Sequence, residues 1–245
     1  MVKNKTILVR PIRIRGKKKK VFKSSRKRYQ ERFKIMRKFD NIDKLLMFAL
    51  VYFLFMWSAT VMNAQIKHYD GKLYHVVYSE DYEQPLQVTY TVMCPTGEIS
   101  RSGMDFWKPK GWKTSDNDDY KANVYDKGHM APAAAFNCFD KETLRETFNY
   151  LNCALQHESL NRGPWKELER FERDLSKVFE TVKVNVTVHF DNEPEYVAGG
   201  ALIPSGFTKQ IWAGEHEWTF YFDNVNLKGR DWSDFQIPNI RQIND

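Results

Sequence analysis

Residues 182–188 read VKVNVTV, so valine alternates with other side chains along this stretch. Alternation with a period of two residues is typical of a β-strand with one buried face. Directly before it, residues 164–179 carry apolar side chains at steps of three and four residues and begin with Pro164, which suits a first helical turn. These positions are Trp165, Leu168, Phe171 or Glu172, Leu175 and Phe179. The stretch therefore predicts an amphipathic helix followed by a strand.

Other strand-like stretches lie on both sides of this pair. They are residues 73–78, 86–92 and 218–222, which are rich in β-branched and aromatic side chains. A second, shorter helix is expected at 141–148. The order of strands, central helices and more strands predicts an α+β fold with a mainly antiparallel sheet. Residues 65–245 are long enough for a single hydrophobic core, and we expect one domain there.

The charge of the chain is unevenly distributed. Residues 1–44 hold 18 Lys/Arg and 3 Asp/Glu, whereas residues 45–245 hold 20 and 28. The net charge of +7 thus conceals a basic flank and an acidic remainder with a net charge of −8. A composition with 42% hydrophobic residues and 3 cysteines excludes a collagen-like chain, a low-complexity polymer and a disulfide-stapled miniprotein.

The N-terminal part resembles a targeting region. We expect the basic flank 1–44 to be disordered, because it has too few apolar residues to offset its chain entropy. The segment 45–64 has no charged residue and begins with a continuous apolar block. It predicts either a signal peptide cleaved after Ala64 or a retained membrane anchor. Both alternatives place residues 65–245 outside the cytoplasm, as an exported periplasmic or secreted domain or a membrane-anchored one.

Three cysteines allow at most one internal disulfide. They are Cys94, Cys138 and Cys153. Cys138 with Cys153 is one possible pair, but no feature of the sequence fixes the geometry that a bridge needs. The pairing therefore stays open.

Two segments contain residues suited to chemistry. Residues 126–132 read DKGHMAP, in which a histidine follows a glycine; its near-neutral pKa suits proton removal from water. Further on, Asn161 offers an amide oxygen, a ligand suited to Mg²⁺ or Ca²⁺. On one continuous helix, Asn161 and Glu169 would lie about 12 Å apart along the axis and about 80° apart around it. Both could then not bind one ion directly, so Glu169 is expected to orient water molecules of the ion.

Taken in order, these segments resemble the DNA/RNA non-specific endonuclease family, of the ββα-metal or His-metal finger class. Residues 126–129 are similar to the family's Asp-Arg-Gly-His box, and residues 161–169 to its Asn-x-x-x-Trp-x-x-Leu-Glu run. Asn152 and Gln156 also match the family pattern. Two later segments, 203–211 and 237–239, resemble its Pro-x-x-Phe-x-Lys and Pro-Asn elements. The resemblance implies a ββα-metal finger site carried by the central helices.

The resemblance also implies a function: an exported, metal-dependent, sequence-non-specific endonuclease that hydrolyses phosphodiester bonds of DNA and RNA to 5′-phosphate products. His129 is then expected to be the general base, and Asn161 the protein ligand of Mg²⁺, with Mn²⁺ or Ca²⁺ as other possible ions. Glu169 would position water, Asn152 would help to hold the site, and Arg101 would contact phosphate.

One residue departs from the family pattern. Lys127 stands where the family usually has arginine. Lysine keeps the positive charge but loses the planar fork that binds two phosphate oxygens, so Lys127 is expected to contact phosphate more weakly. Together with the acidic charge of the domain, this substitution leaves an alternative: a catalytically weak or inactive module that binds nucleic acid or protein and keeps the nuclease fold.

Overall fold

The computed structural model describes residues 65–96 and 99–238. These residues belong to one compact unit, Ala64–Asp245. The flank 1–44 and the apolar segment 45–64, predicted as a signal peptide or membrane anchor, lie outside the described residues. Within the described ranges, no helix has the length and apolar character needed to cross a membrane.

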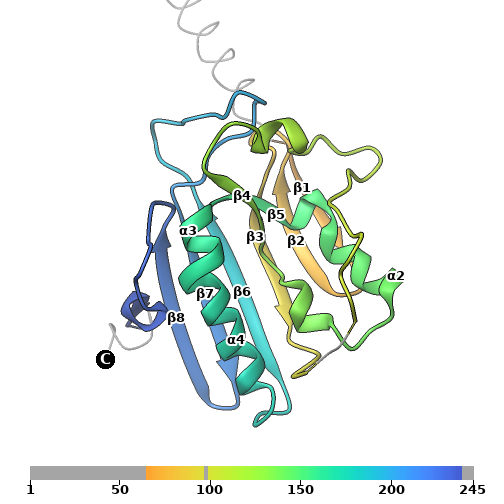
Figure 1. Ribbon diagram of the computed structural model, residues 1–245, viewed down its shortest axis with the longest axis vertical. Helices are drawn as coiled ribbons and strands as arrows, with labels where there is room; N and C mark the ends of the chain where they lie inside the picture. Colours follow the sequence, from red (N-terminus) through yellow and green to blue (C-terminus); the bar gives the residue numbers. More distant parts are fainter. Residues whose placement is uncertain (1–64, 97–98, 239–245) are drawn as a thin grey trace, which may run out of the picture. The chain divides into compact units, whose positions relative to one another are not determined.

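A seven-stranded sheet forms one layer of the unit (Figure 1). Its strands, in spatial order, are β1 (Ile66–Asp70), β2 (Tyr74–Ser79), β3 (Gln84–Thr91), β6 (Val182–His189), β7 (Gly206–Ala213), β8 (His216–Asp223) and β9 (Gln236–Ile237). Every neighbouring pair is antiparallel. The predicted α+β fold with a mainly antiparallel sheet is therefore confirmed. The sequence did not predict β7, in which Gly206 and Lys209 occupy buried positions.

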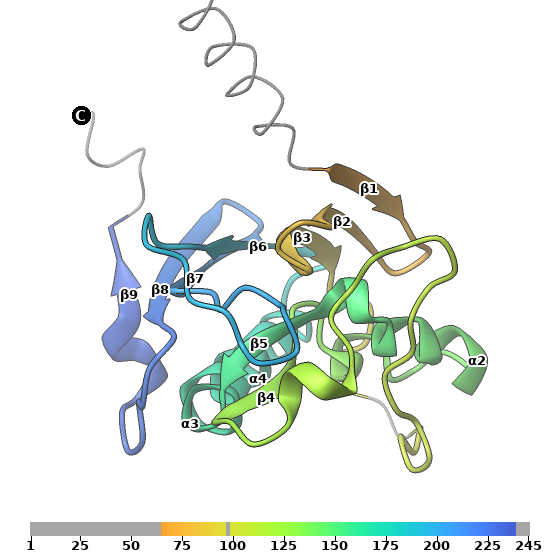
Figure 2. The same cartoon turned by 90° about the horizontal axis from the view of Figure 1, so that it is seen from above.

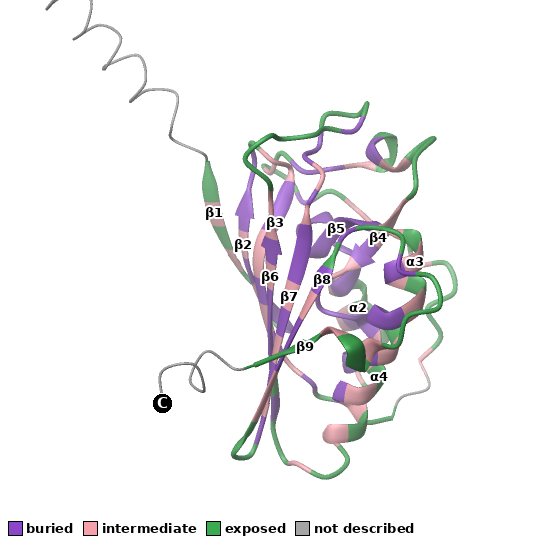
Figure 3. Cartoon of the chain, turned by 90° about the vertical axis from the view of Figure 1, so that its left-hand side faces the viewer, coloured by how far each residue is buried: buried purple, intermediate pink, exposed green. Residues whose placement is uncertain are grey.

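The helices and a second, two-stranded sheet lie on one face of the large sheet (Figures 2 and 3). The small sheet pairs β4 (Tyr125–His129) with β5 (Cys153–His157), and the α-helices are α2 (Lys141–Leu144), α3 (Glu158–Leu160) and α4 (Lys166–Leu175). The remaining helical turns are η1 (Asn117–Tyr120), η2 (Ala133–Phe136), η3 (Arg145–Phe148), η4 (Tyr150–Asn152), η5 (Asn161–Trp165) and η6 (Trp232–Phe235). The helix predicted at 141–148 forms as α2 followed by η3.

The main core lies between the large sheet and α4. Val88, Val186 and Ile211 point inward from β3, β6 and β7, and Trp165 and Leu168 meet them from the helical side; all five are fully buried. Burying each such side chain contributes about 1.5–3 kcal/mol. This packing holds α4 against the sheet, and it thereby sets the positions of the α4 side chains that face away from the sheet.

The predicted helix 164–179 differs from the observed one at both ends. Helix α4 ends at Leu175, and the chain continues past it as a turn. Before α4, the π-helical turn η5 contains Gly163 with φ −107° and ψ −115°, outside helical values. Pro164 follows it and has no N–H for the preceding turn. Asn161 and Glu169 therefore do not lie on one continuous helix, and the expected offset of 12 Å and 80° does not apply.

The disulfide joins Cys94 to Cys138, with their Cα atoms 5.6 Å apart. The possible pairing of Cys138 with Cys153 is wrong. Cys153 is a buried free thiol on β5, and its sulfur lies 3.1 Å from the hydroxyl of Tyr120. The backbone N–H groups of Met93 and Cys94 both donate to the carbonyl of Ala135, which brings Cys94 near the end of η2 and thus near Cys138.

Candidate active site

A cavity of about 510 Å³ lies between β4, the loop that carries Arg101, and the helical segment η5–α4. Five of the six predicted site residues line it: Arg101, Lys127, His129, Asn161 and Glu169. They come from segments up to 68 positions apart in the sequence, counted from Arg101 to Glu169. The fold therefore brings the predicted residues to one place.

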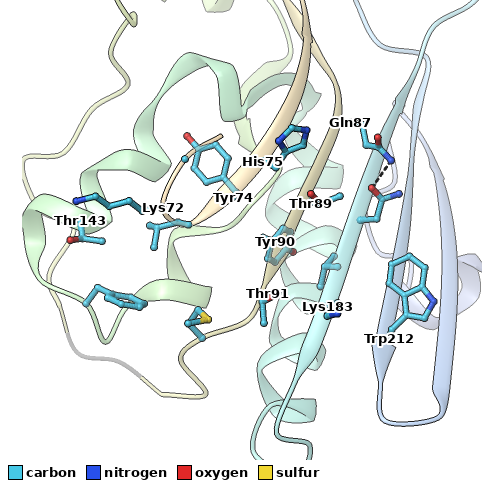
Figure 4. Close-up of a pocket in the computed structure, with 16 residues that line it drawn as sticks. Lys72, Tyr74, His75, Gln87, Thr89, Tyr90, Thr91, Thr143, Lys183 and Trp212 are labelled. Atoms are coloured by element: carbon cyan, nitrogen blue, oxygen red, sulfur yellow. Dashed lines mark hydrogen bonds between the residues drawn. The ribbon is translucent and has the colours of Figure 1, made fainter. Parts of the chain in front are cut away.

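A larger cavity of about 1000 Å³ runs along β2, β3 and β6 (Figure 4). Gln87, Lys183 and Trp212 are among its lining residues. It contains none of the predicted site residues, and the candidate active site is therefore the smaller cavity.

The two strands of the small sheet position His129. Strands β4 and β5 are antiparallel, with Gly128 opposite Ala154 and His129 opposite Cys153. A Cβ atom built on Gly128 would lie 2.5 Å from Oε1 and 2.6 Å from Cβ of Gln156. Glycine is required here because the Gln156 side chain occupies the space that any larger residue would need.

The ring of His129 is held by two aromatic neighbours. Its centroid lies 4.7 Å from that of Phe106 and 4.9 Å from that of Phe148. Nε2 is enclosed and has no hydrogen-bond partner among the described residues. Burial, with a smaller effect of Arg101, lowers the pKa of His129 to about 3. At pH 7 the imidazole is therefore neutral and able to accept a proton.

The side chain of Asn161 is oriented by Asp126. Asn161 Nδ2 donates to Oδ2 of Asp126 at 2.9 Å, and Arg162 grips both carboxylate oxygens at 2.8 and 2.6 Å. Although burial raises it, the hydrogen bonds from Arg162 and Asn161 hold the pKa of Asp126 below its ordinary value. Because the amide nitrogen is used, Oδ1 of Asn161 is the atom left for a cation. Asp126 begins the quoted box, but the sequence did not predict this orienting contact.

The donor set fits a cation that keeps most of its water. Among residues 65–96 and 99–238, no group of three or more His, Cys, Asp or Glu residues could hold a metal ion. A single amide oxygen, from Asn161, matches Mg²⁺, which dehydrates reluctantly and prefers oxygen ligands. A softer ion that needs several nitrogen or sulfur ligands does not match this set.

Glu169 lines the cavity from α4. Burial raises its pKa to about 7; Lys209 opposes this effect and Glu172 adds to it. Its carboxyl group therefore changes protonation state near neutral pH, which is unusual for a glutamate.

Lys127 lines the cavity but is also held on another side. Its Nζ lies 3.0 Å from Oδ1 of Asp105 and 2.5 Å from Oδ1 of Asn117. The rings of Phe106 and Tyr150 flank the ammonium group, with centroids at 5.7 and 5.5 Å. Although burial opposes it, the hydrogen bond to Asp105 raises the pKa of Lys127, so the charge persists at all working pH values.

Asn152 does not line the cavity, although the sequence grouped it with the catalytic residues. It is fully buried. Its Oδ1 accepts from the Ala131 N–H at 2.7 Å, and its Nδ2 donates to the carbonyls of Ala131 and Thr147 at 2.8 and 3.0 Å. With all its polar atoms occupied, Asn152 acts on the site by clamping the loop that follows His129.

The family of the chain follows from its similarity to known proteins. Residues 59–245 match the family model described as DNA/RNA non-specific endonuclease. The chain belongs to the DNA/RNA non-specific endonuclease family. Its fold is also similar to the crystal structure of the EndoG/EndoGI complex, with a TM-score of 0.60 and 25% identity over 70% of this chain and 80% of that chain.

Two sequence relatives of this endonuclease family member are nucleases. Bovine (Bos taurus) "Endonuclease G, mitochondrial" is 32% identical over 91 residues, which cover 36% of this chain and 30% of the relative. "Nuclease EXOG, mitochondrial" from Xenopus laevis is 43% identical over 68 residues, which cover 28% of this chain and 19% of the relative. Each match thus spans less than a third of the relative.

These names correct one prediction. The basic flank and the apolar segment 45–64 predict an exported or membrane-anchored domain, whereas the relatives are named as mitochondrial proteins. The prediction of export is therefore wrong. A basic flank followed by an apolar block does not by itself distinguish between destinations, because segments directed to different compartments share positive charge and apolar stretches.

The cavity of this endonuclease family member is strongly basic. Arg162, Lys166 and Arg173 add to the two predicted basic residues, so five cations face one carboxylate, that of Glu169. Two of these cations are paired outside the lining, Arg162 with Asp126 and Lys127 with Asp105, so the positive charge at the cavity comes mainly from Arg101, Lys166 and Arg173. We call the five basic lining residues the basic wall. The sequence contained a signal for part of it, because Lys166, Glu169 and Arg173 follow the three- and four-residue steps of one helix face. Lys166 and Arg173 were not among the predicted site residues.

Proposed function

We propose that the chain is a metal-dependent, sequence-non-specific endonuclease that hydrolyses phosphodiester bonds of DNA and RNA and leaves 5′-phosphate ends. The observation that supports this most directly is that His129 and Asn161 line the same basic cavity of about 510 Å³. A neutral imidazole and an amide oxygen across one cavity suit a proton acceptor and a cation ligand on either side of a phosphodiester.

His129 is proposed to take the proton from the attacking water. Its Nε2 is enclosed, so Nδ1 is the ring nitrogen that remains for this role. The low pKa keeps the ring unprotonated before substrate binds. A phosphodiester anion entering the cavity favours the imidazolium form and so raises the basicity of His129 when it is needed.

Asn161 is proposed to hold the divalent cation, with Mg²⁺ as the first choice and Mn²⁺ or Ca²⁺ as alternatives. Asp126 accepts a hydrogen bond from the amide nitrogen of Asn161, which leaves Oδ1 available, and Arg162 balances the negative charge of Asp126. Bound there, the cation supplies positive charge that stabilises the charge developing on the phosphate. Glu169 is proposed to orient water at the cavity, and Arg101 to contact phosphate.

The basic wall is proposed to attract the substrate. Phosphate contacts provide most of the affinity in binding that is independent of sequence, and this affinity falls with salt. Arg101, Lys166 and Arg173 supply such contacts at the cavity within an otherwise acidic domain, whereas Lys127 and Arg162 are shared with Asp105 and Asp126. Strong salt sensitivity of cleavage is the expected consequence.

A plasmid-nicking assay with the full chain tests the proposal. Nicking should require Mg²⁺ and stop in EDTA. His129→Ala should lower the rate by about 10²–10⁴-fold. His216→Ala is a matched control, because His216 is exposed on β8 and does not line the cavity. Cleavage that persists in EDTA, or equal rates for His129→Ala and His216→Ala, would overturn the proposal.

The alternative of an inactive module has one supporting observation. Lys127, which replaces the family arginine, is already bound to Asp105 and Asn117. An inactive module would retain a labelled oligonucleotide in a gel-shift assay and yet leave plasmid DNA intact at every Mg²⁺, Mn²⁺ and Ca²⁺ concentration. Cleavage with any of the three ions rejects it.

A further inference from the structure

Helix α4 lies against one face of the large sheet (Figures 1 and 3), and a buried ion pair joins it to β7. Nζ of Lys209 donates to Oε1 of Glu172 at 2.8 Å, and both side chains are 0% exposed. Charged side chains are almost never fully buried unless they are paired.

The pair is fully hydrogen-bonded on its carboxylate side. Oε2 of Glu172 accepts from the hydroxyl of Tyr90 at 2.7 Å, so each carboxylate oxygen has its own partner. The ammonium group of Lys209 also lies 3.8 Å from the centroid of the Trp165 ring. The pair is therefore built into the core by contacts from β3, η5, α4 and β7.

Stability alone does not account for this pair. Lys209 occupies an inward position of β7 between the buried residues Phe207 and Ile211. The apolar pattern of residues 164–179 allowed either Phe171 or Glu172 as the inward-facing residue of α4. Glu172 is the one that is buried. Hydrophobic residues of similar volume in place of a buried ion pair are often neutral or stabilising. Packing therefore does not require charges at these two positions.

Glu169 is the candidate site residue that neighbours this pair along α4. It precedes Glu172 by three positions on α4, which makes the two side chains neighbours on the helix surface. After burial, Lys209 is the largest influence on the pKa of Glu169 and lowers it, while Glu172 raises it. Two buried charges of opposite sign thus act on a residue that lines the cavity.

We propose that Lys209 is a positioning residue of the nuclease site: its buried ammonium group favours the carboxylate form of Glu169 at the cavity, and Glu172 limits this effect by sharing the ammonium. The inference rests on the proposed function, in which Glu169 orients water. The other charged groups that act on Glu169 are Arg101 from the preceding loop and Arg173 from α4. Both lower its pKa and stay constant in the test below.

The test compares Glu172→Gln with the double variant Lys209→Met/Glu172→Gln. Position 172 is neutral in both proteins, so they differ only in the ammonium group. The measurement is kcat/KM for a labelled oligonucleotide from pH 5 to pH 9 with Mg²⁺. The acid limb is the decline of kcat/KM at low pH. In Glu172→Gln its midpoint should lie about one pH unit lower than in wild type, because Lys209 then acts on Glu169 alone. In the double variant the limb should lie at least about one unit above that of Glu172→Gln.

Lys183→Met is the matched control, because Lys183 is an exposed lysine on the adjacent strand β6. Its acid limb should equal that of wild type. A purely structural pair would change thermal stability and leave the acid limb in place, so equal midpoints for Glu172→Gln and the double variant overturn the proposal. If the double variant does not fold, an unchanged midpoint in Glu172→Gln overturns it. If Glu172→Gln does not fold because Lys209 is left unpaired, an acid limb of the double variant no higher than that of wild type overturns it.

A second readout does not depend on turnover. The carbon-13 shift of the Glu169 carboxyl group, identified by its loss in Glu169→Gln, gives its titration in the metal-free protein. The same order of midpoints is expected, with Glu172→Gln lowest and the double variant higher. If wild type cleaves no nucleic acid, the proposed function fails, yet this titration still decides whether Lys209 controls Glu169. Identical titrations in both variants overturn that control.

Discussion

The amide nitrogen of Asn161 donates a 2.9 Å hydrogen bond to Oδ2 of Asp126, which lies 35 residues earlier in the chain. This contact joins the first residue of β4's Asp-Lys-Gly-His run to the start of η5. It determines which atom of the amide faces the cavity, because a neutral amide has one donor end and one acceptor end. Its loss should therefore affect cation binding before it affects the fold.

Asp126→Asn tests this relationship. The new amide keeps the shape of Asp126 but loses the negative charge that binds Arg162 and orients Asn161. Changes in groups that orient a metal ligand typically cost 10–100-fold in metal affinity. The Mg²⁺ concentration for half-maximal cleavage should rise by about that factor, with much of the rate restored at saturating Mg²⁺. Asp118→Asn, at an exposed acidic residue paired with Lys121, should not shift it.

Gly128→Ala tests the close approach of β4 to Gln156. The added Cβ would lie 2.6 Å from Cβ of Gln156, an atom near the backbone that cannot swing away. Overpacking of this kind costs about 1–3 kcal/mol. The free energy of unfolding, measured by urea denaturation, should fall by this amount. Stability of Gly128→Ala equal to that of wild type would contradict the prediction.

The sequence predicted those strands whose alternation is uninterrupted. Residues 182–188 form β6 because every second side chain is a valine that faces the core. Strand β7 was not predicted, since an inward lysine, Lys209, breaks the apolar alternation of its buried side. The burial of Lys209 depends on its ion pair with Glu172 of α4, which lies 37 residues earlier in the chain. Tertiary contacts of this kind are absent from a local pattern.

The site was predicted to a similar extent. The order of motifs pointed to His129 and Asn161, and the fold brings them to one cavity. The contact of Asp126 with Asn161 was not foreseen, because it depends on how η5 bends at Gly163. Asn152 was assigned to the right region, but its position behind the cavity follows from a buried loop that no periodicity describes.

The pH dependence of stability should reflect His129. Burial lowers its pKa from 6.5 to about 3 in the folded protein. Between these values the unfolded chain binds more protons than the folded one, so the free energy of unfolding falls as the pH is lowered through this window. The slope from one such group is at most about 1.4 kcal/mol per pH unit.

Urea denaturation of wild type and His129→Gln from pH 7 to pH 4 measures this effect. Glutamine does not titrate, so stability of the variant should decline less over this range. The raised pKa of Glu169 acts in the opposite direction, since a folded pKa of about 7 stabilises the fold as the pH falls towards 4.5. This contribution is present in both proteins and does not affect their difference. Parallel stability curves would show that His129 is not held in the neutral form.

The ion pair between Lys127 and Asp105 should control affinity for phosphate. Nζ of Lys127 lies 3.0 Å from the exposed carboxylate of Asp105, which competes with substrate phosphate for the same cation. Asp105→Asn removes this competition, so KM for DNA should fall severalfold while kcat stays the same. Lys127→Met removes the cation itself. It should raise KM and reduce the magnitude of the slope of log(1/KM) against log salt by about 0.9, the effect of one phosphate contact.

Lys183→Met is the reference for the same measurement, since Lys183 lies outside the candidate active site. Its KM and salt slope should match wild type. A rise in KM in Asp105→Asn would instead mean that Asp105 orients Lys127 towards the phosphate. If Asp105 only competes with phosphate, Lys127→Arg should lower KM, since its fork can bind the Asp105 carboxylate and still present a donor to the cavity.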